Sequence, residues 1–135
     1  MILGDDAVTA MWRYLNSHCE DIRIPQGRIF KYERSEKMAE GTYIAINHLP
    51  FVRQNVVDSG IVNVNIHVPK TASNEPDTKE LHRIAKCISI LFPSDSAYLE
   101  GCYFELYSDS RPTRDNDGTF YVNLKFNVTF NNLKD

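Results

Sequence analysis

The sequence predicts an α+β domain in which two amphipathic helices pack on a mostly antiparallel four-stranded sheet. Three observations predict this fold class. The stretch Thr119–Phe130 alternates apolar and polar residues over about twice the usual length of a strand. A second stretch, Ile61–Val68, alternates in the same way. Two other segments carry apolar residues at helical spacing, so both kinds of element are expected to share one hydrophobic core.

The stretch Thr119–Phe130 is expected to supply a large part of that core. Successive side chains of a strand lie on opposite faces, so one face of this stretch collects apolar side chains only. The other face carries Tyr121 and a series of polar residues. The side chains expected to be buried are Phe120, Val122, Leu124, Phe126, Val128 and Phe130.

The four predicted strands are expected to form two hairpins. Residues 42–48 would pair with residues 61–68, and residues 102–108 would pair with residues 119–130. The connection within the second hairpin, Asp109–Gly118, is longer than a two-residue turn. We therefore expect this loop to project from the body of the protein and to be mobile.

Each predicted helix has a capping residue and an apolar stripe. Asp5 or Asp6 can cap a helix that ends near Ser17. Asp77 and Glu80 match the DxxE form of a capping box, which marks the start of the second helix. Both stripes are expected to pack on the sheet. They consist of Val8, Met11, Trp12 and Leu15 in the first helix, and of Leu81, Ile84, Cys87 or Ile88, and Leu91 in the second.

Composition limits the classes of protein to which the chain can belong. Its 135 residues, 42% of them hydrophobic, suit one domain over residues 1–135. A net charge of −3, with 15 basic and 18 acidic residues spread evenly, gives no positive field for a phosphate backbone, so no direct nucleic-acid ligand is expected. Three cysteines without CxxC spacing fit free thiols in a reducing compartment. No apolar run approaches the roughly 20 residues of a membrane span, and we expect a cytosolic protein without a membrane partner.

No catalytic, cofactor-binding or metal site is predicted. The segment Asp115–Gly118 has residue types found in calcium loops, but it lacks the later ligand positions of an EF-hand and is typical of a turn. His48, His67 and His82 occur singly and are expected on the surface. Cys87 cannot use His82 as a base, because a five-residue spacing on a helix separates them by about 140°.

The order of the segments resembles that of a known family. An N-terminal amphipathic helix is followed by GTYIAINHLP and VVDSGIVNVNIHVPK, then by the helix DTKELHRIAKCISILF, and then by GCYFELYSDS and GTFYVNLKFNVTF. Over Asp5–Phe130 this order is similar to that of the tail completion and tail terminator proteins of long-tailed phages. The resemblance implies a phage or prophage structural protein that forms a ring, typically of six subunits, terminating the tail tube and joining tail to head.

The resemblance also implies partners and a location. The partners would be further copies of the chain, the tail tube protein and the head–tail connector proteins. The location would be the host cytoplasm during assembly and then the tail–neck region of the virion. The family has no catalytic residues, so an enzyme is not expected. The segment Lys31–Gly41 and the stretch between Pro50 and Ser59 depart from the simplest members, which leaves a head-to-tail adaptor, or neck protein, as an alternative. A small-molecule-binding α+β domain is a further alternative, because fold does not determine function.

Two charged surfaces are predicted to form the ring interface. A closed ring of identical subunits needs two different contact surfaces on each subunit. We expect the loop Asp109–Gly118 to meet the charged segment Arg34–Glu40 of the next subunit, because opposite charges can set the register of an interface. Outward asparagines would either line an interface or face water. The predicted interface residues are Arg34, Glu36, Lys37, Glu40, Arg111, Arg114, Asp115 and Asp117, and the outward asparagines are Asn63, Asn65, Asn123 and Asn127.

Overall fold

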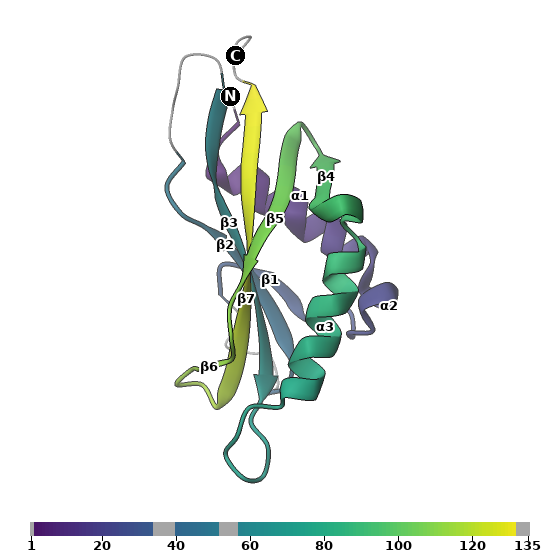
Figure 1. Cartoon of the computed structure of the whole chain (residues 1–135), viewed down its shortest axis with the longest axis vertical. Helices are drawn as coiled ribbons and strands as arrows, with labels where there is room; N and C mark the ends of the chain where they lie inside the picture. Colours follow the sequence, from purple (N-terminus) through teal and green to yellow (C-terminus); the bar gives the residue numbers. More distant parts are fainter. Residues whose placement is uncertain (1, 34–39, 52–56, 132–135) are drawn as a thin grey trace.

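The protein consists of one long sheet with its two long helices on the same face (Figure 1). In this computed structural model, residues 2–33, 40–51 and 57–131 are described. The helices are α1 (Gly4–Ser17), α2 (Cys19–Ile22), α3 (Thr78–Ile90) and the 3₁₀ helix η1 (Pro93–Asp95). The strands are β1 (Ile29–Lys31), β2 (Tyr43–His48), β3 (Val57–Pro69), β4 (Ser96–Leu99), β5 (Cys102–Asp109), β6 (Thr113–Arg114) and β7 (Thr119–Asn131).

The sheet differs from the predicted one in the number of strands and in their direction. The part of the chain that the structure describes has seven strands in the order β1-β2-β3-β7-β5-β4, with β6 paired to β7. β1 runs parallel to β2, with Ile29 beside Ile44, so the sheet is mixed. The prediction of a mostly antiparallel four-stranded sheet with two helices is therefore wrong. It missed β1, β4, β6 and α2 because elements of two to four residues show too few periodic positions to be recognised.

The two longest strands pair with each other in the middle of the sheet. β3 and β7 are antiparallel and in continuous register from Val57 opposite Asn131 to Pro69 opposite Thr119. The pairs expected within the two hairpins are present, since β2 pairs with β3 and β5 pairs with β7. The pairing of β3 with β7 joins these hairpins into one sheet. It brings the C-terminal half of β3 next to the turn that precedes β7.

The alternation of β7 corresponds to a buried and an outward face, as predicted. Leu124 is 3% exposed, and Phe126 and Val128 are fully buried. The same cluster contains the apolar stripes of α1 and α3, including Met11 and Ile84. Burying these side chains together is the main favourable term in folding. The remaining inward apolar side chains of the two central strands are Phe120, Val122, Phe130, Val62, Val64, Ile66 and Val68, all buried, and Asp58 of β3, opposite Phe130, is buried as well.

The two long helices begin at different kinds of cap. Asp77 Oδ1 accepts a hydrogen bond from the backbone N–H of Glu80 at 3.2 Å, so α3 has the predicted N-cap. At α1 the cap residue is Leu3 rather than an aspartate, and its backbone N–H donates to Asp6 Oδ2 at 2.8 Å. Within residues 2–33, 40–51 and 57–131, no helix is both long and apolar enough to cross a lipid bilayer.

The connection Asp109–Gly118 lies along β7 instead of projecting as a free arm. Its residues 113 and 114 form β6, which pairs with β7. The backbone N–H of Ser110 donates to the Asn123 carbonyl at 2.9 Å, and the N–H of Asp115 donates to the Thr119 carbonyl at 2.9 Å. These hydrogen bonds hold both ends of the segment, contrary to the expectation of an unattached loop.

Candidate functional site

A network of asparagine amides covers part of the sheet face that the helices leave open. Asn63 Nδ2 donates to Asn47 Oδ1 at 2.9 Å. Asn123 Nδ2 donates to Asn63 Oδ1 at 3.1 Å and to Asn65 Oδ1 at 2.9 Å. The register of β2, β3 and β7 places these residues side by side. The network therefore links three strands through uncharged groups.

Three aromatic rings stack across the same strands, next to the amides. The imidazole of His67 lies 4.3 Å from the ring of Tyr43, measured between centroids, with an angle of 7° between the planes. On its other side the Tyr121 ring lies at 5.1 Å and 28°. His67 is only 7% exposed. The prediction of a surface His67 is therefore wrong, because its outward position on β3 is enclosed by the neighbouring tyrosines.

The turn before β7 brings two carboxylates to His67. Asp117 Oδ1 accepts hydrogen bonds from the backbone N–H of Thr119 at 3.0 Å and from its hydroxyl at 2.5 Å. Asp117 Oδ2 accepts one from the Tyr43 hydroxyl at 2.5 Å. His67 Nδ1 lies 3.0 Å from Thr119 Oγ1 and 3.6 Å from Asp115 Oδ2. One histidine nitrogen and two carboxylate oxygens thus lie within 4.8 Å of one another.

This cluster lies beside a cavity of about 740 Å³ on the open face of the sheet. Side chains of the amide network, Asn47 and Asn65, form part of its wall, and Tyr32 and Arg114 also line it. The cavity therefore joins the asparagine network, the aromatic stack and the carboxylates into one polar surface. This surface, with the residues named here and above, is the candidate functional site.

The ionisation of Asp117 depends on its hydrogen bonds. Burial raises the pKa of this carboxyl, but the hydrogen bonds from Thr119 and Tyr43, together with the charge of His67, have the larger combined effect. The pKa of Asp117 is therefore lower than the ordinary value of 3.8. The turn is accordingly held by a carboxylate that is ionised at neutral pH.

The two buried cysteine thiols, Cys19 and Cys102, do not have the surroundings of a nucleophile. Burial, with Asp6 and Glu100 nearby, raises the pKa of Cys102 to about 11. Burial also raises the pKa of Cys19. A catalytic cysteine needs a lowered pKa, because the thiolate is the reactive form. These two thiols are therefore structural.

Of the predicted interface segment Arg34–Glu40, which precedes β2, the structure describes only Glu40. Arg34, Glu36 and Lys37 lie outside the described residues. Glu40 is exposed, and it lines a cavity of about 350 Å³ together with Asp117. Within one subunit, Glu40 therefore lies close to the turn Asp115–Gly118. The sequence had instead predicted that these two regions meet between neighbouring subunits.

The charged residues of the other predicted surface point in different directions. Arg111 is exposed. The guanidinium of Arg114 lies 4.8 Å from the centre of the Phe120 ring and donates to the Asn74 carbonyl at 3.3 Å. Asp115 instead pairs with the buried imidazole on β3. With Asp117, which accepts hydrogen bonds from Tyr43 and Thr119, three of the loop's four predicted interface charges are used within the subunit, and the role of these residues in assembly stays a prediction.

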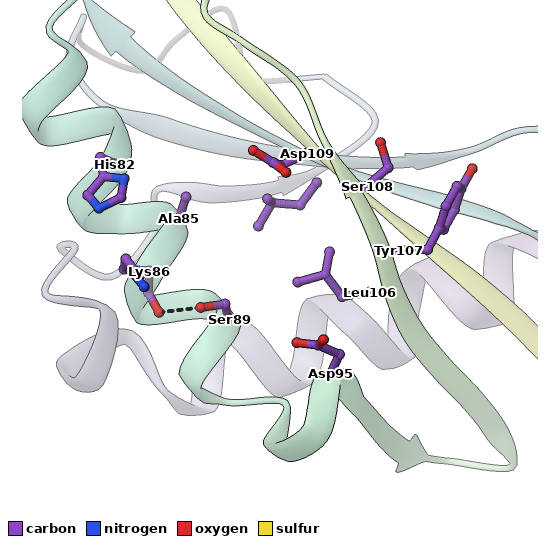
Figure 2. Close-up of a pocket in the computed structure, with 10 residues that line it drawn as sticks. His82, Ala85, Lys86, Ser89, Asp95, Leu106, Tyr107, Ser108 and Asp109 are labelled. Carbon is purple, nitrogen blue, oxygen red and sulfur yellow. Dashed lines mark hydrogen bonds between the residues drawn. The ribbon is translucent and has the colours of Figure 1, made fainter.

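A separate groove lies between α3 and β5 (Figure 2). The register of β5 shifts between Leu106 and Ser108, so that Asp109 pairs with Leu124 and faces the helix. The groove has a volume of about 380 Å³. Its lining combines apolar side chains with Lys86 and two carboxylates, so its charges do not favour one class of ligand.

The site residues that the sequence did not nominate are Tyr32, Tyr43, Asn47, His67, Thr119 and Tyr121. Their proximity depends on the pairing of β3 with β7. The alternation of both strands was a usable signal, because aligning their apolar faces puts His67 on the open face. The turn at Asp117 was recognised from the sequence. Without the pairing of β3 with β7, however, the sequence did not indicate that this turn lies beside His67.

No protein-family model matches the sequence, and no curated protein matches it. The functional proposal therefore depends on the site and on the resemblance in element order.

Proposed function

We propose that the chain is a structural subunit of a long-tailed phage or prophage that assembles as a ring at the end of the tail tube. In this role it terminates the tube and joins the tail to the head through contacts with the tube protein and the connector proteins. The order of segments over Asp5–Phe130 supports the phage assignment. The open face of the sheet supports an assembly role.

The composition of that open face is the observation that carries the proposal. On β2 and β3, residues 43–48 and 61–68 contain no Asp, Glu, Lys or Arg, although 24% of the chain is charged, and the outward charges on the neighbouring strands are Lys125 on β7 and Glu105 on β5. The outward side chains of these strands are mainly amides and aromatic rings. The buried centres of protein interfaces are depleted in charge and enriched in aromatic residues. A hydrogen-bonded amide network can be covered by a partner at lower cost than charged groups.

The two ends of the sheet provide the different surfaces that a ring requires. β1 and β4 are its outer strands, so each subunit offers two unlike edges. On β4, Tyr98 is 72% exposed, which is unusual for a large aromatic side chain. An edge strand with such a side chain can pair with or pack against a neighbouring chain. The charged positions Glu40 and Arg111 would then set the register at the rim of the contact.

Electron microscopy of the purified protein mixed with its tail tube protein tests the proposal. The expected result is a closed ring of density at one end of each tube. A ring located on the head side, away from the tube end, would identify the neck adaptor instead. The proposal is wrong if no ring forms and if deletion of the gene leaves tail length and head joining normal.

A charge substitution tests whether the open face makes the contact. Asn127 is exposed on β7 and lies opposite Glu105 on β5, so a lysine at this position has a partner within the subunit. Asn127→Lys should therefore fold normally but fail to form rings on the tube. Lys79→Glu, an exposed position on α3, is the matched control and should assemble like the wild type. Normal rings from Asn127→Lys would exclude this face from the interface.

A further inference from the structure

We propose that the outer edge of β4 is a binding site for an extended segment of a partner protein, which pairs with β4 as an additional strand. β4 is the last strand at its end of the sheet and pairs with β5 alone (Figure 1). The other side of its backbone therefore offers hydrogen-bonding groups that a further strand can use. The inference is independent of the proposed function, because it concerns an edge that each isolated subunit already has.

The turn between β4 and β5 determines which backbone groups of β4 point outward. This turn has two residues, with φ of 48° and 85°, as tight hairpin turns require. The residues that flank such a turn hydrogen-bond to each other, and so does every second pair beyond them. Ala97 and Leu99 therefore bond to β5, whereas Ser96 and Tyr98 direct their N–H and C=O groups away from it. Within the described ranges, no backbone hydrogen bond from another element reaches Ser96 or Tyr98.

The opposite edge of the sheet, at β1, is closed by hydrogen bonds within the subunit. Trp12 Nε1 donates to the Ile29 carbonyl at 2.9 Å, and the N–H of Glu33 donates to the Lys31 carbonyl at 2.8 Å. The Lys31 ammonium also lies 5.2 Å from the centre of the Trp12 ring. β4 contains no proline, charged residue or bulge, which are features that deter pairing at an edge. Its length of four residues is its protective feature, and a short segment of a partner matches that length.

Two exposed tyrosines give the added strand a surface on which to pack. Tyr98 and Tyr103 lie opposite each other in the register of β4 and β5, so their side chains share one face of the sheet. Tyr98 is 72% exposed and Tyr103 is 36% exposed. Pairs of aromatic and β-branched side chains on neighbouring strands stabilise a sheet. The bound segment is therefore expected to place a β-branched side chain beside Tyr98.

The charges at the Ser96 end of the edge favour a segment with a basic residue. Asp95 precedes Ser96, and Glu105 lies opposite Ser96 on β5. Both carboxylates are exposed, and neither has an ion pair in the described part of the chain. At the other end of β4, Glu100 is already paired with Arg13 at 2.6 Å. In an antiparallel arrangement, a lysine or arginine at the C-terminal end of the segment would lie beside the two unpaired carboxylates.

A second copy of this chain is a less suitable occupant of the edge. Two antiparallel β4 strands centred between Ala97 and Tyr98 would place Asp95 of each copy beside Glu100 of the other, and like charges at such positions are destabilising. Four residues per copy also bury much less than the roughly 1,200 Å² of a stable dimer. β1 of a second copy cannot easily supply the strand, because its outward carbonyls are already bonded.

Peptide binding followed by nuclear magnetic resonance of the full chain tests the proposal. The probe is a short capped peptide that alternates valine and threonine and ends in lysine. In the free protein, the amide hydrogens of Ser96 and Tyr98 should exchange with solvent faster than those of Ala97 and Leu99. The probe should shift the signals of β4 and slow the exchange at Ser96 and Tyr98. A matched peptide that ends in glutamate should bind about 2- to 5-fold more weakly.

Three variants locate the contact. Tyr98→Pro removes the outward N–H and leaves the hydrogen bonds to β5 in place, so it should fold and lose peptide binding. Tyr98→Thr keeps the N–H and is the matched control, which should still bind. Glu105→Lys changes an exposed charge and should remove the preference for the peptide that ends in lysine.

Four results would overturn the proposal or part of it. The open edge is excluded if the amides of Ser96 and Tyr98 are already protected in the free protein, or if the lysine peptide at millimolar concentration shifts no signal of β4. Strand pairing is excluded if Tyr98→Pro binds the peptide as tightly as Tyr98→Thr. Equal binding of the two peptides would exclude a basic segment as the preferred partner. A dimer of the wild type that Tyr98→Pro abolishes would assign the edge to a second copy instead.

Discussion

Replacing Phe126 with alanine should remove a large part of the stability of the fold. Phe126 is fully buried, and its ring lies 4.8 Å from the ring of Phe92 and 6.4 Å from that of Phe104, measured between centroids. Truncation of a buried phenylalanine costs about 3 to 5 kcal/mol, and the lost aromatic contacts place this site in the upper half of that range. We expect a loss of about 4 kcal/mol. For 135 residues this lowers the melting temperature by about 14 °C.

Urea denaturation followed by circular dichroism measures this loss. The slope of the free energy against urea concentration should stay constant, because the variant changes the packing of the native state and not the surface exposed on unfolding. Asn127→Ala, the exposed neighbour on the same strand, is the control and should change the free energy by less than about 0.5 kcal/mol. A loss below about 0.5 kcal/mol for Phe126→Ala would show that the two faces of β7 have been assigned the wrong way round.

Three other local features have measurable consequences. Asp77→Ala removes the N-cap of α3 and should lower the free energy of unfolding by about 1 kcal/mol, whereas Asp77→Asn should cost little; equal losses would argue against the cap. Folding lowers the pKa of Asp117 from its ordinary value of 3.8. The ionised carboxylate therefore stabilises the folded protein at pH values above 3.8, and this stabilisation is lost as the pH falls below that value. Asp117→Asn should flatten the acid side of a curve of melting temperature against pH, and an unchanged curve would contradict the role of its hydrogen bonds. Cys102 should resist alkylation in the native protein while the partly exposed Cys87 reacts, and rapid native reaction at Cys102 would contradict its raised pKa.

The long elements could be predicted from the sequence because burial imposes a period on them. Over twelve residues of β7, six successive inward positions repeat the same choice of apolar side chain, and Phe126 and Val128 are fully buried as expected. The stripe of α3 and its cap at Asp77 are equally regular. The short strands β1 and β4 have no such repetition. Their place in the sheet is decided by contacts with β2 and β5, which the local sequence does not contain.

The candidate site was not predicted because it depends on a contact between distant parts of the chain. Asp117 was recognised as part of a turn, and His67 was placed correctly on an outward face. Treating the two hairpins as separate units left these residues unconnected. The register that places His67 opposite Tyr121 also decides that the histidine is buried, so its burial could not be judged from β3 alone.

The pairing of β3 with β7 also determines when the protein can fold during synthesis. Paired residues are 50 positions apart at Pro69 and Thr119, and 72 apart at Asp58 and Phe130. At roughly 5 to 20 residues per second, the ribosome needs about 3 to 10 s to add 50 residues after β3 emerges. During this time β3 is an apolar strand with an open edge toward its missing partner, the kind of segment that aggregates or recruits chaperones. The central pairing of the sheet therefore forms late, after β7 has left the exit tunnel.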